Sequence, residues 1–512
     1  MSNTVKRTFP ELYPSRTKIV ATVGPASESE EKLAALIRAG VDVFRLNMAH
    51  NTPEQAQPVY DRIRKVANEI GFSVAILADL AGPKMRLGPI PGDSYDCVND
   101  TLVKFLRGET TTEPDSFTST YAPLIDELQP GDRVMLTDGT VALQVVTKEN
   151  DVVTCRVVQG GTVRSRQGIN LPGVKLSVKT LQPRDIENAK WAVKVGIDFL
   201  GMSFVRSADD VNELRQILLD NRPAGRDVSD IPHIISKIEK PEAVDNINTI
   251  VAVSDGIMVA RGDLGVEVDI AQIAIIQKRI IKICQRQCKP VIVATQMLES
   301  MHHETIPTRA ETTDVANAIL DGADACMLSG ESAVGEYPVQ AVQMMQRIAI
   351  ETEKLLKTQL KHDIFDAIIM PVLQELEEAN KLVDHDAFYK HVDIITNAMC
   401  DAGVKLADDI NAALMLVASS TGKTTRNLSK KKHFTMTLGT STNEFALRRM
   451  SLYWGVIPIA NLPENPREQL EFVVEAGKRE GYLKPDDHIV MINSIIPNSN
   501  TRNVLYVHKV TE

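Results

Sequence analysis

The sequence predicts a (β/α)8 barrel that carries an inserted β-rich segment and is followed by an open α/β domain. Three observations predict this fold class. Short β-branched apolar runs alternate with amphipathic helical stretches over the first two thirds of the 512 residues. One interval between two such runs is far longer than the others. A new series of strands and helices begins after about residue 352.

Eight apolar runs precede that point, and each is typical of a buried parallel strand. Helical stretches such as SEEKLAALIRAG (29–40) and IAIIQKRIIKICQRQ (273–287) lie between them, with apolar residues three and four positions apart. Eight alternations predict a closed barrel. The runs are KIVATV (18–23), VDVFRLNM (41–48), VAILADL (74–80), FLGMSF (199–204), HIISKIE (233–239), GIMVARG (256–262), PVIVAT (290–295) and ACMLSG (325–330).

The long interval separates the third run, which starts at 74, from the fourth, which starts at 199. It exceeds a normal repeat by roughly 90 residues, enough for a small domain. QPGDRVMLTDGTVALQVV and DVVTCRVVQGGTVRSRQG within it resemble short strands joined by turns that contain glycine. Because the insertion follows a strand, on the side where barrel active sites lie, we expect it to act as a lid.

The C-terminal part contains AALMLVASS, HFTMTLGTS, VIPIAN, HIVMIN and NVLYVHKV, alternating with helical stretches. This pattern predicts a separate α/β domain that begins with the helical ETEKLLKTQL. We expect the barrel in 1–88 and 175–351, the lid in 89–174 and the α/β domain in 352–512. The stretch 361–394 has little strand signal and receives no assignment.

Composition excludes several classes of protein. A formal net charge of −10 argues against a nucleic-acid partner. The N-terminal residues lack the apolar core of a signal peptide, and no apolar run reaches the length of a membrane span. Six scattered cysteines favour reduced thiols and a cytoplasmic location. Cys284 and Cys288 share a helical face and could form half of a metal site, although packing is the favoured interpretation.

Charged residues at the carboxyl ends of barrel strands are where catalysis is expected. Lys237 and Glu239 are two residues apart, so on a strand they point to the same side. Asp263 follows the next strand, about 4.8 Å away, and two such carboxylates suit one divalent cation. A plain Lys–Glu ion pair is the alternative for each residue alone, and their convergence favours a metal site.

Further polar side chains belong to the same predicted mouth. Four cations around a metal (Arg45, Lys84, Arg86 and Lys237) suit a phosphoryl group, whose transfer depends on positioning and charge stabilisation. A lone arginine on a strand is usually only a surface charge. The remaining candidates at strand ends are Asn47, His50, Asp79, Ser203, Thr295, Ser329 and Glu331.

The stretch SSTGKTT (419–425) contains Gly-Lys-Thr but is not a Walker A loop, because Val417 occupies the position that requires glycine. The loop follows a predicted strand and precedes a helix. Its hydroxyls and amides suit a phosphate, and on local sequence alone a simple helix cap is about as good an interpretation.

Seven strings resemble the pyruvate kinase family, in an order that covers nearly the whole chain. They are TKIVATVGPAS, RLNMAH, SKIEKPEAV, DGIMVARGDLGVE, PVIVATQMLESM, PTRAETTDVANAILDGADACMLSGESAVGEYP and LYWGVIP. The resemblance implies a barrel, a mobile lid, a regulatory C-terminal domain and a homotetramer. It also implies transfer of phosphate from phosphoenolpyruvate to ADP in glycolysis, giving pyruvate and ATP, with Mg²⁺ or Mn²⁺.

The resemblance also implies roles for the residues at matching positions. Lys237 would stabilise the phosphoryl group, and Glu239 and Asp263 would hold the metal. Arg45 and Arg86 would contact phosphates. The other implied roles are substrate binding by Arg261, Gly262, Asp263 and Thr295, nucleotide binding by Asn47 and His50, and proton delivery by Thr295, Ser329 and Glu331.

The chain departs from the family pattern at its potassium site. Ala49 and Asp79-Leu80 lack two of the usual ligands, and Lys84 replaces a glutamate. Ala81 replaces the family's usual lysine, and AHN lacks the glycine that commonly follows the histidine. We expect the Lys84 ammonium to take the place of the ion, because a unit charge about 4 Å away is worth roughly 4 kcal/mol at an effective dielectric constant of 20.

In the C-terminal domain the resemblance places an effector phosphate on the loop after the first strand. The expected ligands are Ser419, Ser420, Thr421, Gly422, Lys423 and Thr424, and the effector would be a sugar phosphate or nucleoside monophosphate. Two rival functions remain: another metal-dependent barrel enzyme of phosphoenolpyruvate or pyruvate, such as an aldolase or lyase, and a non-enzymatic metabolite-binding regulator.

Overall fold

The computed structural model describes residues 15–174, 176–359, 394–463, 465–495 and 502–512. The unassigned stretch 361–394 lies outside these residues, except for Ile394. Within them, eight parallel strands close into a barrel in the order β1-β16-β15-β14-β13-β12-β3-β2. These strands are β1 (Lys18–Thr22), β2 (Val43–Asn47), β3 (Ala75–Asp79), β12 (Phe199–Met202), β13 (His233–Ile238), β14 (Gly256–Ala260), β15 (Val291–Ala294) and β16 (Ala325–Leu328). The predicted fold class and all eight predicted barrel strands are confirmed.

Helices surround the barrel and bury their apolar faces against it. In α2, Leu33, Leu36 and Ile37 are buried, Ser29 caps the first turn, and Gly40 ends the helix at φ 115°. The helices are α2 (Glu30–Ala39), α3 (Pro53–Ile70), α5 (Pro183–Val195), α6 (Ala208–Asp220), α7 (Pro241–Asp245), α8 (Ile247–Val253), α9 (Arg261–Glu267), α10 (Ile273–Arg286), α11 (Arg309–Leu320), α12 (Gly330–Ala333) and α13 (Pro338–Gln359). Short 3-10 turns are η2 (Val228–Asp230), η3 (Ile270–Gln272) and η4 (Glu299–His302).

Two boundaries differ from the sequence predictions. The sixth strand ends at Ala260, so Arg261 and Gly262 start helix α9 and do not continue the strand. Helix α13 runs through the expected boundary at 351/352, because its amphipathic pattern continues into ETEKLLKTQ. The barrel's last helix therefore includes residues that we assigned to the C-terminal domain.

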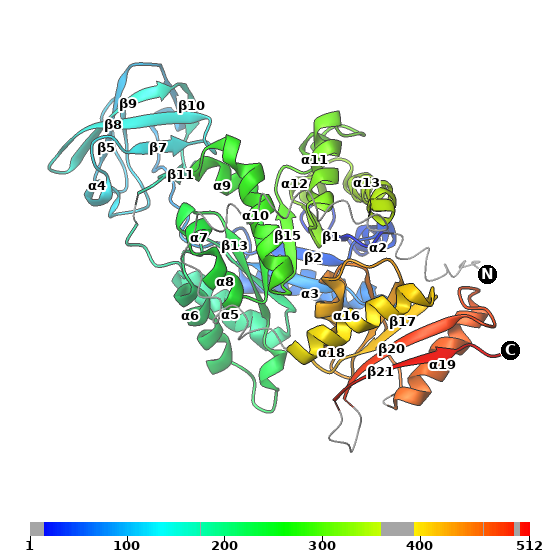
Figure 1. The fold of residues 1–512 in the computed structure, drawn as a ribbon. Helices are drawn as coiled ribbons and strands as arrows, with labels where there is room; N and C mark the ends of the chain where they lie inside the picture. Colours follow the sequence, from blue (N-terminus) through cyan, green and yellow to red (C-terminus); the bar gives the residue numbers. More distant parts are fainter. Residues whose placement is uncertain (1–14, 175, 360–393, 464, 496–501) are drawn as a thin grey trace.

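The insertion is a β-rich unit between β3 and α5, at the upper left of Figure 1. A six-stranded sheet has the order β11-β7-β8-β9-β5-β6, and β10 pairs with β4. Arg86 and Leu87 already bridge to Gly168 and Ser119, so pairing with the inserted unit begins two residues earlier than 88. Its elements are η1 (Pro91–Asp93), β4 (Ser94–Cys97), β5 (Leu102–Leu106), β6 (Ser116–Phe117), α4 (Leu124–Glu127), β7 (Arg133–Leu136), β8 (Val141–Glu149), β9 (Val152–Gln159), β10 (Gly161–Arg164) and β11 (Ile169–Asn170).

The C-terminal sheet lies on the opposite side of the barrel from the insertion (Figure 1), in the order β19-β18-β17-β20-β21. All five predicted strands are present, and only β21 runs antiparallel to its neighbour. The elements are α16 (Ile394–Asp409), β17 (Leu414–Ala418), α17 (Lys423–Ser429), β18 (Met436–Thr440), α18 (Glu444–Arg449), η5 (Met450–Leu452), β19 (Val456–Pro458), α19 (Pro466–Arg479), β20 (His488–Ile495) and β21 (Arg502–Lys509).

The C-terminal domain packs against the barrel through the segment around η5. Met450, Leu452 and Tyr453 belong to one buried cluster with barrel residues such as Val20 and Phe199. The carboxyl ends of the strands carry the polar residues described below. No helix among the described residues is long and apolar enough to span a bilayer.

Candidate active site

Lys237 lies at the centre of the barrel mouth and is buried. Its Nζ lies 2.8 Å from Glu239 Oε1 and 3.4 Å from Asp79 Oδ2, and it donates a hydrogen bond of 2.8 Å to Ser203 Oγ. Burial by itself lowers the pKa of Lys237, but the nearby carboxylates of Asp79, Glu239 and Asp263 outweigh it and raise the pKa above the ordinary value. The ammonium is therefore charged at any physiological pH.

Arg45 is fixed in the same mouth by Asp79. Its Nε and Nη2 donate to Asp79 Oδ2 at 2.8 and 2.6 Å, and Nη1 donates to Thr22 Oγ1 at 3.1 Å. Burial raises the pKa of Asp79, but the charges of Lys237 and Arg45 lower it further than burial raises it. Gly201 is required beside this carboxylate, because a Cβ there would lie 2.7 Å from Asp79 Oδ1.

Glu239 and Asp263 supply the predicted pair of carboxylates, although Asp263 lies in the first turn of α9 rather than at a strand end. Glu239 is buried, accepts a hydrogen bond of 2.8 Å from the Phe204 amide, and has its Oε1 2.8 Å from the Lys237 ammonium. Burial raises the pKa of Glu239, and the negative charge of Asp263 adds to this effect. Two neighbouring carboxylates that repel each other at the barrel mouth fit a divalent cation such as Mg²⁺ or Mn²⁺.

Thr295 follows β15 with a φ of 69°, which is strained for a β-branched residue. Its hydroxyl accepts a hydrogen bond of 2.7 Å from the Gly262 amide and donates one of 2.7 Å to the carbonyl of Ala294. Arg261 is held on the other side by Asp314, at 2.7 Å. The strain at Thr295 thus keeps its hydroxyl next to the start of α9.

Lys84 lies on the loop between β3 and the insertion, and its side chain is exposed. It interacts electrostatically with Asp79 and Asp263 on one side and with Lys237 and Arg86 on the other. Desolvation and the neighbouring cations lower the pKa of Lys84. The structure therefore places this ammonium near two of the acids of the mouth.

Sequence reasoning missed Asp185, whose carboxylate binds the backbone of the loop that carries Lys84. Its Oδ1 accepts hydrogen bonds from the amides of Ala81 and Gly82 at 3.1 and 3.3 Å, and its Oδ2 accepts one from Gln182 at the start of α5. Gly82 has a φ of 63° and packs on Phe204, so a side chain there would clash. The sequence signal, Gln-Pro-Arg-Asp, indicates only a helix start.

Positive side chains surround the residues predicted to bind the nucleotide. Asn47 ends β2, and its Oδ1 accepts a hydrogen bond of 3.1 Å from Ala49. Burial first, and then the charges of Lys84 and Arg86 among others, lowers the pKa of His50. An imidazole in this position is neutral at pH 7, and the surrounding positive charges favour an anionic ligand.

Ser329 and Glu331 follow β16. Glu331 is buried and accepts hydrogen bonds from the amides of Ser329 at 2.7 Å and Leu298 at 3.1 Å. Burial raises the pKa of Glu331, and the charge of Glu299 adds to it. The carboxyl thereby links the loop after β15 to the turn after β16.

Residues 419–422 join β17 to α17, with Gly422 at a φ of 76°, and Lys423 and Thr424 begin the helix. Ser419 and Thr424 are buried, whereas Ser420 and Thr421 are exposed. β17 is the central strand of the sheet, with β18 on one side and β20 on the other. The chain first adds strands on the β18 side and then crosses to the β20 side, so β17 marks the point where the strand order switches. Ligands of open α/β sheets bind at such a point, outside the carboxyl ends of the strands.

The fold and this mouth define a barrel enzyme that combines acidic metal ligands with several fixed cations, an arrangement suited to phosphoryl transfer. Comparison with known proteins identifies the family. The profile described as "Pyruvate kinase, barrel domain" matches residues 14–342, and "Pyruvate kinase, alpha/beta domain" matches residues 397–508. The chain belongs to the pyruvate kinase family.

Individual relatives agree with this assignment. A pyruvate kinase of Geobacillus stearothermophilus is 36% identical over 97% of this chain and 81% of the relative. One of Mycobacterium intracellulare is 37% identical over 97% of this chain and 99% of the relative. The crystal structure of a pyruvate kinase from Cryptosporidium parvum superposes with a TM-score of 0.85 at 31% identity, covering 100% of this chain and 99% of that one. Enzymes of this family act on phosphoenolpyruvate and ADP with a divalent metal ion, so both rival functions are set aside.

Proposed function

We propose that this pyruvate kinase transfers the phosphoryl group of phosphoenolpyruvate to ADP with Mg²⁺ or Mn²⁺ and needs no potassium. The observation that supports the chemistry best is the buried Lys237 ammonium, held by Glu239 and Asp79 at the barrel mouth. A fixed cation in a desolvated site stabilises the negative charge that spreads over a phosphoryl group in transfer. The neighbouring guanidinium of Arg45 is already oriented by Asp79 and acts in the same way.

The divalent cation would be held by Glu239 and Asp263, and it supplies charge neutralisation to the substrate. The chain's own residues complete the site around it. Arg86 contacts the nucleotide phosphates together with Asn47 and His50, and the backbone of Arg261 and Gly262 faces the substrate carboxylate.

Thr295, Ser329 and Glu331 deliver the proton that converts the enolate product to pyruvate. The Thr295 hydroxyl is positioned by the Gly262 amide, and the raised pKa of Glu331 lets this carboxyl hold a proton at a higher pH than an exposed glutamate does. Because the ketone is far more stable than the enolate, conversion of the enolate to the ketone makes the overall transfer to ADP favourable.

Lys84 replaces potassium in this account. Its electrostatic interactions with Asp79 and Asp263 support the proposal, since these acids flank the phosphoryl cations. An ammonium fixed to the chain supplies one positive charge at any salt concentration, so no monovalent ion has to bind.

The C-terminal domain would bind a phosphorylated effector through Ser419, Ser420, Thr421, Gly422, Lys423 and Thr424. The position of this segment at the point where the strand order switches supports this assignment. We further propose a homotetramer and the three predicted domains, with the barrel extended to the end of α13. A cytoplasmic location is favoured by the six cysteines, which are thiols rather than disulfides.

Replacing Lys237 tests the proposed chemistry directly. We expect Lys237→Met to lower kcat about 10²- to 10³-fold with phosphoenolpyruvate and ADP, because a buried charge-stabilising group is lost. Lys18→Met is the matched control: Lys18 is also buried and pairs with Asp42 at 3.1 Å, but it lies at the opposite end of the strands. Equal losses of kcat in both variants would contradict a chemical role for Lys237.

A further inference from the structure

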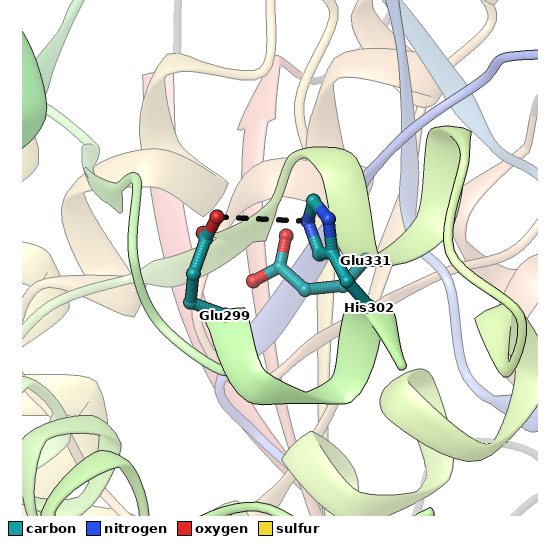
Figure 2. Close-up of side chains that lie close together, drawn as sticks. All are labelled: Glu299, His302 and Glu331. Carbon is teal, nitrogen blue, oxygen red and sulfur yellow. Dashed lines mark ion pairs between the residues drawn. The ribbon is translucent and has the colours of Figure 1, made fainter. Parts of the chain in front are cut away.

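Three potential metal ligands lie close together beside the catalytic mouth. Only one of them, Glu331, already has a role in the proposed function. Figure 2 shows the side chains of Glu299, His302 and Glu331 facing one another, two from η4 and one from α12. One ligand atom of each lies within 4.8 Å of those of the other two. Among the residues that the structure describes, no other group of three such side chains lies this close together.

The imidazole of His302 points a nitrogen into this cluster without a hydrogen bond. Its Nε2 is buried and has no hydrogen-bond partner. Glu299 Oε1 lies 3.8 Å away, too far for a hydrogen bond. The ring packs so tightly over Gly330 that a Cβ at that position would lie 2.1 Å from His302 Cε1. A buried, unsatisfied nitrogen costs stability, so its position calls for a ligand.

The oxygens of Glu331 retain room for a cation. Each accepts one hydrogen bond from a backbone amide, of Leu298 or Ser329, and a carboxylate oxygen has a second lone pair. These amides fix the carboxylate in place, as hydrogen bonds from the surroundings do for metal ligands generally. Glu299, in contrast, is more than half exposed and can move, so an ion can enter from solvent on its side.

The donor set points to a particular class of ion. Imidazole nitrogen with two carboxylates suits Zn²⁺, Co²⁺ or Ni²⁺, whereas the all-oxygen pair Glu239 and Asp263 suits Mg²⁺. Tetrahedral zinc with bonds near 2.1 Å needs ligand atoms roughly 3.4 Å apart. Small rotations of Glu299 and His302 would close the present separation to that value.

We propose that Glu299, His302 and Glu331 form a second metal site, which takes a divalent transition-metal ion such as Zn²⁺. Three protein ligands leave one coordination position for water. The ion would join η4, which follows Thr295 in the chain, to α12, which follows Ser329. Occupancy would therefore hold together the two loops that carry the proposed proton-delivery residues.

Zinc titration of the full-length protein tests the site without substrate, so the result is independent of phosphoryl transfer. Calorimetry is run in excess Mg²⁺, which occupies the all-oxygen site. We expect one Zn²⁺ per chain, and the affinity should fall at least about tenfold in His302→Asn and in Glu299→Gln. Glu331 is left unchanged because of its proposed role in proton delivery.

His303→Asn is the matched control, since His303 is the next residue, is 79% exposed and faces Glu336 at 3.1 Å. It should bind Zn²⁺ as the wild type does. Thermal midpoints without zinc establish that each variant is folded, and zinc should raise the midpoint of wild type and His303→Asn but not of His302→Asn. The proposal is overturned if the wild type binds no zinc in excess Mg²⁺, or if His302→Asn binds it with unchanged affinity.

Discussion

We propose that Lys84 is the clearest departure of this chain from the family pattern, with a positive side chain in place of a glutamate of the potassium site. Its neighbours explain why a cation is tolerated there: Asp79 and Asp263 attract it, although Lys237 and Arg86 oppose them. At about 4 Å and an effective dielectric constant of 20, one such charge is worth roughly 4 kcal/mol. We therefore expect the side chain at this single position to decide the monovalent-ion requirement.

Changing the sign of that charge should change the ion requirement. We expect Lys84→Glu to lose most of its activity in potassium-free buffer and to regain it when potassium is added, because the carboxylate recreates an ion ligand. Lys84→Arg keeps the positive charge and should remain independent of potassium. Steady-state rates across a potassium series measure both. Identical ion dependence in Lys84→Glu and wild type would refute the substitution hypothesis.

Part of the site could be predicted from single residues and part could not. Glu239 follows the last residue of β13 and is two positions from Lys237, so their proximity follows from the period of a strand. Asp185 could not be found in this way, because it reaches the amide of Ala81 from 104 positions further along the chain. The sequence pattern around it indicates only a helix start, and the hydrogen bond depends on the packing of α5 against the loop.

At the scale of elements, alternation of runs predicted the strands well, because each barrel strand is a short apolar run between helices. The sequence pattern predicted the ends of strands and helices less accurately than their presence. Helix α9 begins at Arg261, where the apolar run suggested a continuing strand, and so Asp263 reaches Glu239 from a helical turn. The order of strands in the C-terminal sheet depends on crossovers that local sequence does not encode.

The junction of β17 and α17 carries the segment that we propose to bind the phosphate of an effector. We expect a hexose monophosphate, a hexose bisphosphate or a nucleoside monophosphate to bind the wild type, and Lys423→Gln to weaken that binding at least about tenfold, since a charge-assisted contact is worth about 1.5–3 kcal/mol. Lys405→Gln, on the exposed surface of α16, serves as the control. Calorimetric titration measures all three. Binding of none of these metabolites to the wild type would rule out the effector site.

At the scale of the whole molecule, buried ion pairs join the C-terminal domain to the barrel. Asp324, which precedes β16, pairs with Lys430 and, at 3.1 Å, with Lys432. Asp198 pairs at 2.7 Å with Arg448 of the C-terminal domain and at 2.6 Å with Arg64 of the barrel helix α3. Asp324 and Asp198 lie at the amino ends of their strands, so buried charges as well as apolar packing join the C-terminal domain to the barrel.

Removing the carboxylate of Asp324 should destabilise that connection. Burial lowers the pKa of Lys432 to about 8 despite the opposing charge of Asp324. We expect Asp324→Asn to cost about 3–5 kcal/mol, because two buried ammonium groups lose their partner. The midpoint of chemical denaturation measures this loss. Asp409→Asn, which breaks only the exposed pair with Lys405, should leave the midpoint unchanged; equal shifts in the two variants would contradict the account.

The central claim, a pyruvate kinase with a built-in monovalent cation, is tested most directly by one comparison. ATP formation from phosphoenolpyruvate and ADP is measured with Mg²⁺, first in potassium-free buffer and then with potassium added. We predict the same full rate in both buffers, because the Lys84 ammonium is always present. Activity that appears only with potassium would contradict this account of Lys84, and no activity in either buffer would contradict the proposed reaction.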